Sequence, residues 1–340
     1  MGIIHPVVQG PFGGGMSTAR LTAAVSNCGG LGSFGAHQLS AEQIGPVAAE
    51  IRALTARPFA LNLWVSTHDK GGDQVDAAEF ERVWRLFEPW YRELGIDKPA
   101  PPARFHADFE VQFEALLAAQ PAVFSFVFGV PRKPLLQECR RRGILTIGAA
   151  TSIAEAQALD GAGVDAIVAS GFEAGGHRPS FLARPEDSLM GTFALLPLVV
   201  DRVQVPVIAA GGIADRRGVH AALALGAQVA QIGTAFLACN ESGASDAHRQ
   251  ILFSDAAQST TLTRAFSGRL ARGVRNHWTT EMASRINELP PFPVQSWFTG
   301  QMRAAAIAQG RTDLVSLWSG QIAPNLVHRS ATDLMHSLTH

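Results

Sequence analysis

The sequence predicts an α/β protein, a (β/α)8 TIM barrel with an inserted helical segment and a mostly helical C-terminal extension. Eight short apolar runs alternate with longer stretches that have the helical period. Glycine-rich turns follow several of the runs, and in a barrel the loops after the strands form the active site. The 340 residues exceed the roughly 250 of one barrel and leave room for additions.

The expected strands are short, apolar and bounded by Gly, Pro or polar residues, which is typical of a buried parallel sheet. An open doubly wound sheet is the alternative. It usually carries Gly-x-Gly-x-x-Gly after its first strand, which the consecutive Gly13–Gly15 does not match. The eight strands are Pro6–Gln9, Leu31–Ala36, Phe59–Val65, Val123–Gly129, Leu145–Ala149, Ala166–Ser170, Val207–Ala210 and Ala230–Phe236.

The helical stretches between the strands carry start and stop signals. Ser40 and Ser152 are suitable N-caps, and Gly143, Gly163 and Gly226 follow helix ends. The expected helices are Thr18–Asn27, Ala41–Leu54, Pro134–Arg142, Ile153–Ala162, Thr192–Arg202 and Arg217–Leu225.

Two segments depart from this alternation, so that the barrel itself is expected over 1–66 and 118–245. Residues 67–117 contain a helix with one aromatic-rich face and then a proline-rich stretch, and we expect an inserted lid or wall. That face carries Val83, Phe87, Trp90 and Leu94. Residues 246–340 are expected to form a helical region on the substrate side of the barrel.

Composition favours an enzyme that acts on small molecules. Hydrophobic residues make up 47% of the chain, and the net charge is −1 with no Lys/Arg run, so nucleic-acid and membrane partners are not expected. No apolar run reaches the roughly 18 residues of a membrane helix. Three distant cysteines without a Cys-x-x-Cys pair fit reduced thiols and a cytoplasmic location. A homodimer is left open.

His177 is the first candidate for proton transfer. It follows the apolar run 166–170 and the turn Gly175-Gly176, so a barrel strand would deliver its imidazole to a ligand. Histidine titrates nearest neutral pH, which suits a general acid or base.

The residues around His177 and the other histidines have less support. Glu173 and Arg178 flank His177, and we expect a local ion pair between them. No Gly-x-Ser-x-Gly nucleophile motif, His-x-x-x-His pair or Cys cluster is present, so no metal site is expected. The histidines without a supporting pattern include His37, His68, His106 and His248.

Two glycine loops predict a phosphate site. Gly211 and Gly212 follow the seventh strand, and Gly233 and Thr234 lie in the eighth run, where barrels commonly hold a phosphate. Glycines allow backbone N–H groups to point at an anion, and a threonine hydroxyl can donate as well. The alternative is that the glycines only let strand and helix pack.

Polar groups at the same rim suit a heterocycle with mixed edges. Gln9-Gly-Pro-Phe-Gly-Gly follows the first strand, and Asn62 lies on the third. On its own, Asn62 is more simply explained as satisfying local backbone, and Trp64 as a core residue.

Five motifs together resemble the nitronate monooxygenase family, formerly called 2-nitropropane dioxygenases, over roughly residues 4–325. Phe12 departs from the methionine common in the family, and Ser170 replaces a longer polar side chain. The motifs are Gly29-Gly-Leu-Gly32, Gly171-Phe-Glu-Ala-Gly-Gly-His177, Ala209-Ala-Gly-Gly-Ile213, Gln231-Ile-Gly-Thr-Ala-Phe236 and Phe266-Ser-Gly-Arg-Leu-Ala-Arg272.

The resemblance implies FMN-dependent oxidation of alkyl nitronates by O2 to carbonyl compounds and nitrite, with nitroalkanes kept as candidate substrates. It implies that His177 lies beside the flavin as catalytic base or substrate-orienting group. Together with Gly211 of the phosphate site, the residues expected to contact FMN are Pro11, Phe12, Gly13, Asn62, Ser170, Gly175, Gly212, Gln231, Ile232, Gly233 and Thr234.

Two other functions remain open at this point. The first is an NAD(P)H-dependent flavin enoyl reductase of the same superfamily, which would need a second nucleotide site and a docking surface for an acyl carrier. The second is a flavin-binding protein without turnover, in which His177 only packs.

Overall fold

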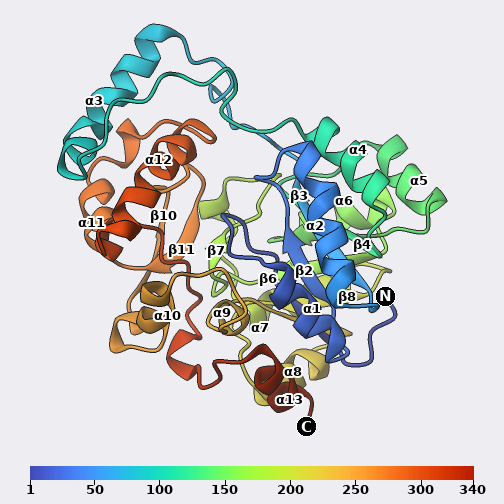
Figure 1. The fold of residues 1–340 in the computed structure, drawn as a ribbon. Helices are drawn as coiled ribbons and strands as arrows, with labels where there is room; N and C mark the ends of the chain where they lie inside the picture. The colour runs from blue at the N-terminus through green and yellow to red at the C-terminus, as the bar shows by residue number, and fades with distance from the viewer.

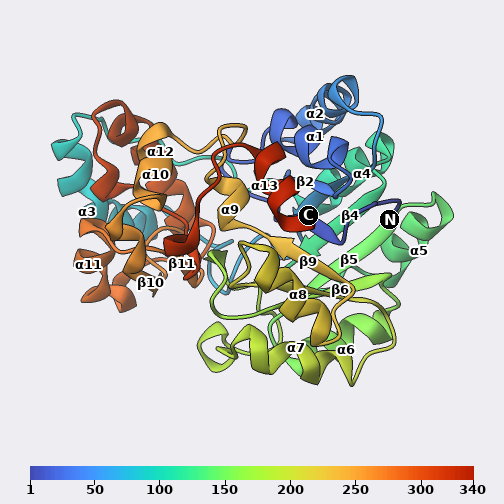
Figure 2. The same ribbon diagram turned by 90° about the horizontal axis from the view of Figure 1, so that it is seen from below.

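The protein has two lobes, a barrel and a smaller lobe beside it, and the computed structural model describes residues 1–340 (Figures 1 and 2). The N-terminal two-thirds of the chain builds most of the barrel. The second lobe combines α3 with the elements from α10 to α12, so segments far apart in sequence share it.

The predicted barrel is confirmed. Its eight parallel strands pair in the order β1-β9-β8-β6-β5-β4-β3-β2, and a parallel bridge between Val8 and Leu31 joins β1 to β2. Small and branched side chains such as Val8, Ala60, Ile147 and Val168 fill the interior as one cluster. The strands are β1 Val7–Gln9, β2 Gly32–Gly35, β3 Phe59–Trp64, β4 Val123–Val127, β5 Leu145–Ala150, β6 Ala166–Ser170, β8 Val207–Ala210 and β9 Val229–Ile232.

The barrel helices lie within two residues of their predicted bounds, except α4, which the sequence analysis did not predict as a helix. The Ser152 side chain caps the first turn of α6, and Gly163 ends that helix with a φ of 81°. The helices are α1 Ala19–Asn27, α2 Ala41–Leu54, α4 Phe109–Ala119, α5 Lys133–Arg141, α6 Ile153–Ala162, α7 Thr192–Val200 and α8 Arg216–Ala224.

The eighth strand is shorter than predicted. β9 ends at Ile232, and the chain turns at Gly233 into the short helix α9, Thr234–Leu237. The apolar residues from 235 to 237 are buried as a helical turn, because a short apolar run alone does not distinguish strand from helix.

The inserted helix α3, Ala77–Glu93, belongs to the second lobe. Its buried residues Val83 and Phe87 pack in one cluster with Trp278 and Phe298, so the predicted apolar face contacts C-terminal elements. Helix α4 packs on α2 and β3 of the barrel. The division of the chain at residue 117, within α4, stays a proposal about domain organisation.

The C-terminal region contains two strands that the sequence did not predict. The antiparallel strands β10, Thr260–Thr263, and β11, Ala271–Val274, join the two-residue strand β7, Gly176–His177, in a second sheet. β11 reads Ala-Arg-Gly-Val, which lacks alternating hydrophobicity. The helices here are α10 Asp246–Leu252, α11 His277–Ala283, α12 Val294–Ala308 and α13 Ala331–Thr339, and α13 packs back on α1 and α8 of the barrel.

Five short 3-10 turns complete the chain: Pro185–Asp187, Asp255–Gln258, Ile286–Glu288, Thr312–Leu314 and Ala323–Asn325. No helix combines the length and the apolar character needed to cross a membrane.

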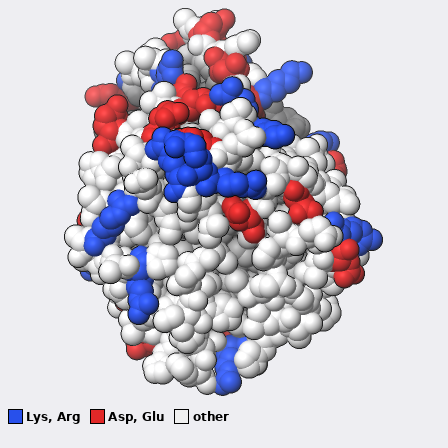
Figure 3. Space-filling model, turned by 90° about the vertical axis from the view of Figure 1, so that its right-hand side faces the viewer, with Lys and Arg blue, Asp and Glu red and all other residues white.

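On the face in Figure 3, positive and negative side chains lie beside one another, and much of the lower part is uncharged.

Two glycine substitutions test how tightly α1 packs on β2. A Cβ added to Gly32 would lie 1.9 Å from the carbonyl oxygen of Thr22, whereas one added to Gly45, inside α2, meets nothing within 4 Å. We expect Gly32→Ala to lower the free energy of unfolding by about 1–3 kcal/mol and Gly45→Ala to raise it by about 0.5–1 kcal/mol. Urea unfolding measures both. Equal effects of the two changes would contradict this packing.

Candidate active site

A cavity of about 510 Å³ lies at the C-terminal ends of the barrel strands, and the second lobe closes its outer side. Ile232, predicted to contact the cofactor, is fully buried in the main hydrophobic cluster and is not among the residues that line the cavity, so its contact stays a prediction. The other predicted site residues all line the cavity: Pro11, Phe12, Gly13, Asn62, Ser170, Gly175, His177, Gly211, Gly212, Gln231, Gly233 and Thr234.

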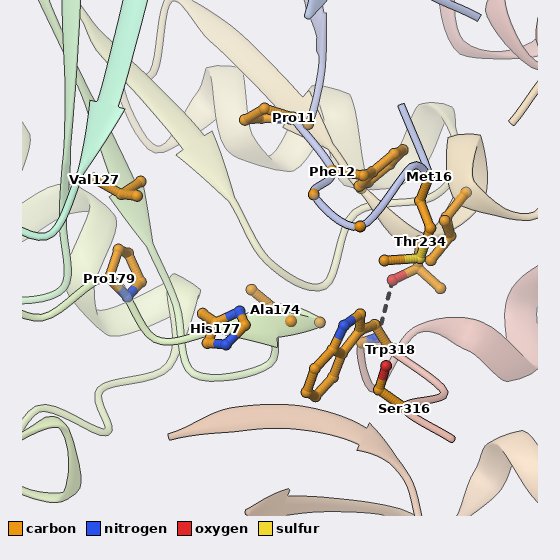
Figure 4. Close-up of a pocket in the computed structure, with 18 of the residues that line it drawn as sticks. Pro11, Phe12, Met16, Val127, Ala174, His177, Pro179, Thr234, Ser316 and Trp318 are labelled. Carbon is orange, nitrogen blue, oxygen red and sulfur yellow. Dashed lines mark hydrogen bonds between the residues drawn. The ribbon is translucent and has the colours of Figure 1, made fainter. Parts of the chain in front are cut away.

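The two glycine loops present free hydrogen-bond donors to this cavity. The backbone N–H groups of Gly211, Gly212 and Gly233 donate to no protein acceptor. Gly211 and Gly212 have φ angles of 106° and 73°, which favour glycine. The Thr234 hydroxyl accepts a hydrogen bond of 2.9 Å from the backbone of Gly320, which leaves its own proton available (Figure 4). Unpaired donors of this kind fit the phosphate group of a flavin nucleotide.

The expected ion pair between Glu173 and Arg178 is wrong. Glu173 accepts hydrogen bonds from the backbone N–H and hydroxyl of Thr192, at 2.9–3.0 Å. Arg178 is fully buried and donates to the carbonyl oxygens of Ser170, Gly171 and Ser188. The guanidinium therefore ties the end of β6 to the loop after β7 through backbone carbonyls in place of a carboxylate, and its Nε has no partner.

His177 reaches the cavity from β7, which pairs with β11 of the second lobe. Its Nε2 lies 2.7 Å from the hydroxyl oxygen of Ser267. The Ser267 hydroxyl also lies 3.2 Å from both the carbonyl oxygen and the amide nitrogen of Arg269. Nδ1 has no protein partner and is open to the cavity. One ring nitrogen is thus held, and the other is free to meet a ligand.

Burial and a nearby cation keep His177 neutral. Together, burial first and then the positive charge of Arg269 lower the pKa of His177 to about 3. Arg269 forms an ion pair of 2.8 Å with Asp69, and its guanidinium lies 4.2 Å from the ring centre of Phe128 and 4.1 Å from that of Phe292. At neutral pH the uncharged imidazole can therefore accept a hydrogen bond at one ring nitrogen and donate one from the other.

Trp64 joins two imidazoles on the cavity wall. It contacts His177 edge-on, with ring centres 4.9 Å apart, and stacks on His37 at 4.0 Å. Burial lowers the pKa of His37 well below its ordinary value. No sequence motif supported His37, yet this residue lies two positions after the C-terminal end of β2, a place that could have identified it.

Asn62 and Gly175 occupy specific places in the wall. The Asn62 amide donates to the hydroxyl of Ser125 at 3.0 Å, a side-chain partner rather than the local backbone expected. A Cβ at Gly175 would lie 2.5 Å from the nitrogen of Gly320, so only glycine allows the two loops to approach this closely.

Residues of the second lobe complete the wall, and no local pattern in the sequence predicted them. Trp318 lies with its ring centre 5.3 Å from that of His177, and Figure 4 shows it between His177 and Thr234. Ser316 lies beside it, and α12 contributes Thr299 and Arg303. These residues come from segments far from the barrel motifs in sequence.

The comparisons with known proteins agree with this site. The family model for nitronate monooxygenase matches residues 1–340. A probable nitronate monooxygenase of Staphylococcus aureus (strain Newman) is 38% identical over 323 residues, covering 94% of this chain and 89% of that protein.

Two solved structures extend the comparison. A nitroalkane oxidase from Streptomyces ansochromogenes superposes with a TM-score of 0.89 at 34% identity, covering 99% of this chain and 95% of that one. FabK from Thermotoga maritima gives a TM-score of 0.75 at 26% identity, covering 99% and 92%. The chain therefore belongs to the nitronate monooxygenase family, whose members are flavin-dependent oxidoreductases.

Proposed function

We propose that the protein binds FMN and oxidises alkyl nitronates with O2 to carbonyl compounds and nitrite, and that nitroalkanes are further substrates. The observation that carries this proposal is the neutral imidazole of His177, with Nδ1 open to the cavity and Nε2 beside Ser267. Membership of the family and the likeness to a nitroalkane oxidase support the same chemistry.

The chain's own residues fit a bound flavin mononucleotide. The N–H groups of Gly211, Gly212 and Gly233 would hold its phosphate, and Asn62 would face the polar edge of its ring. The flavin supplies an acceptor for the substrate's electrons and passes them to O2. A mononucleotide is favoured because Gly13–Gly15 does not form a dinucleotide fingerprint.

His177 has a different task with each form of the substrate. Its neutral imidazole can remove the proton next to the nitro group of a nitroalkane. A nitronate has already lost that proton, so His177 would orient it by hydrogen bonding. Since the ring is neutral, attraction of the anion has to come from another residue.

The proposal is tested by identifying the bound flavin and by measuring turnover of the two substrates. The flavin released by heat is identified by mass, and O2 consumption and nitrite release are then measured with ethyl nitronate and with nitroethane. Rapid anaerobic flavin reduction by NADH, without turnover of nitronate, would favour the enoyl reductase. Bound flavin that reacts with neither would favour a non-catalytic protein, and a chain that binds FAD or no flavin would overturn the proposal.

The phosphate site predicts a glycine requirement. Gly212→Val should raise the dissociation constant for FMN by at least about 10-fold, because loss of hydrogen bonds to an anion costs roughly 1.5–3 kcal/mol each. Gly143→Val is the matched control, since Gly143 has a similar φ of 71° at the end of α5 with nothing within 4 Å. Fluorescence titration of the apoprotein with FMN measures both. An equal loss of FMN affinity in both variants would show that backbone strain, and not the phosphate site, causes the effect.

Replacement of His177 separates its two tasks. His177→Asn keeps a polar group but cannot carry the proton, so turnover of nitroethane should fall by about 10²–10⁴-fold. Turnover of ethyl nitronate should fall much less. His106→Asn is the control, because His106 lies near Trp64 but not on the cavity wall. Unchanged kinetics of His177→Asn with both substrates would refute a catalytic His177.

The lowered pKa of His177 also predicts an acid-sensitive fold. Below the ordinary histidine pKa near 6.5 the unfolded chain gains a proton that the folded chain does not bind until about pH 3, so stability falls between these values. The slope from one such group is at most about 1.4 kcal/mol per pH unit. Urea unfolding of the flavin-loaded protein between pH 7 and pH 4.5 should be less pH-dependent in His177→Asn. Identical slopes would contradict the neutral buried imidazole.

A further inference from the structure

Arg303 is the one lysine or arginine side chain on the wall of the cavity. It extends from α12 in the second lobe, and its Nη1 donates a hydrogen bond of 2.6 Å to the carbonyl oxygen of Gly14, in the loop after β1. It has no carboxylate partner within 4.0 Å. By contrast, Arg269 and Arg311 are each held by acidic side chains.

The remaining donors of Arg303 are free for a ligand. Its Nε and Nη2 have no protein acceptor, and both atoms are accessible rather than fully buried. The hydroxyl groups of Ser296 and Ser316 lie on the same wall and also lack protein partners. Gly300 and Gln38 beside them are exposed, which places this polar group of residues at the rim.

No acidic side chain of the wall pairs with Arg303. Glu173 is the one carboxylate there; Thr192 binds both of its oxygens, and its charge acts on Arg178 and Arg272 rather than on Arg303. Burial lowers the pKa of His37 and of His177. Burial, together with the positive charge of Arg303, also lowers the pKa of His248 to about 4. All three imidazoles are neutral at pH 7, so Arg303 is the one positive side chain on the wall that an anionic ligand can meet.

We propose that Arg303 recognises the negative charge of the substrate, draws nitronate anions into the cavity, and makes the protein prefer them to neutral nitroalkanes. This inference rests on the proposed function. A guanidinium binds an oxyanion through charge-assisted hydrogen bonds, and the two oxygens of a nitronate are such acceptors. The phosphate of the flavin is the other oxyanion that Arg303 could bind. The unpaired N–H groups of the glycine loops would already donate hydrogen bonds to that phosphate.

The kinetic test compares Arg303→Gln, Arg303→Lys and the control Arg311→Gln, all loaded with flavin. Arg311 is paired with Asp313 and Glu93 and does not line the cavity. In Arg303→Gln the KM for ethyl nitronate should rise by about 10- to 100-fold, as expected for loss of a charge-assisted hydrogen bond, with kcat nearly unchanged. The KM for nitroethane should stay the same. In Arg303→Lys the KM for ethyl nitronate should return most of the way to that of the parent, and Arg311→Gln should have the same KM as the parent.

A second readout does not depend on turnover. Nitrate resembles the nitronate oxyanion but is not oxidised, and its binding can be followed by the fluorescence of the tryptophans on the cavity wall, Trp64 and Trp318. The parent protein should bind nitrate more weakly as ionic strength rises. Arg303→Gln should bind it at least about 10-fold more weakly than the parent and show little dependence on salt.

Several results would overturn the assignment. An unchanged KM for nitronate in Arg303→Gln would do so, as would equal losses on nitronate and nitroethane, which indicate displacement of the Gly14 loop. Loss of flavin with an unchanged KM after reloading would assign the guanidinium to the flavin phosphate. If the parent turns over neither substrate, the proposed function fails, whereas nitrate binding still decides whether Arg303 is an anion site.

Discussion

The pairing of β7 with β11 is the interaction on which the active site depends. It places Ala271 opposite His177 and thereby attaches the loop after β6 to the second lobe. The barrel delivers the histidine, but the second lobe fixes it, since Ser267 holds Nε2 and lies four residues before β11. A two-residue strand has little stability of its own, so the position of the imidazole depends on both lobes being in place.

The same contact explains the electrostatics of the cavity. Ser267 and Arg269 lie in one turn, so the residue that holds the imidazole is close in sequence to the cation whose charge adds to burial in lowering the pKa of His177. Arg269 is enclosed by aromatic rings and paired with Asp69, which follows β3 at the start of the insertion. Its field therefore acts on His177 through a medium with little water, where a charge has a longer reach than in solvent. The cavity wall beside His177 is aromatic, with Trp64 and Trp318, and the one arginine of the wall, Arg303, extends from α12.

Local patterns in the sequence predicted the barrel and most of the residues with which the barrel lines the cavity. The boundaries of α2 and α6 match to the residue because capping and periodicity are local properties. The glycine loops were identifiable for the same reason, since they directly follow β8 and β9, and His177 was identifiable because it ends the glycine turn a few residues after β6. The sequence could not place Trp318 or Arg303, because their position depends on packing between segments; Arg303 and Gly14 are 289 residues apart.

The errors have physical causes of the same kind. The apolar run at the eighth strand satisfied the strand pattern, but a glycine allowed the chain to turn and bury the last residues as helix. The Glu173–Arg178 pair was inferred from proximity in sequence, whereas the loop turns their side chains to different partners, Thr192 and the carbonyl of Ser188. β11 has no hydrophobic alternation because its pairing partners, β10 and β7, supply the stabilisation through backbone hydrogen bonds.

The two lobes therefore contribute different chemistry to one cavity. The barrel offers mostly backbone: N–H groups in the glycine loops, close approaches such as Gly175 on Gly320, and few charged side chains. Backbone donors are fixed by the fold and suit a cofactor whose shape does not vary. The second lobe offers side chains, among them Trp318, Ser316 and Arg303, which face the rim where a substrate enters. Under the proposed function, substitutions in α12 would thus alter which substrates bind while the glycine loops of the barrel are left intact.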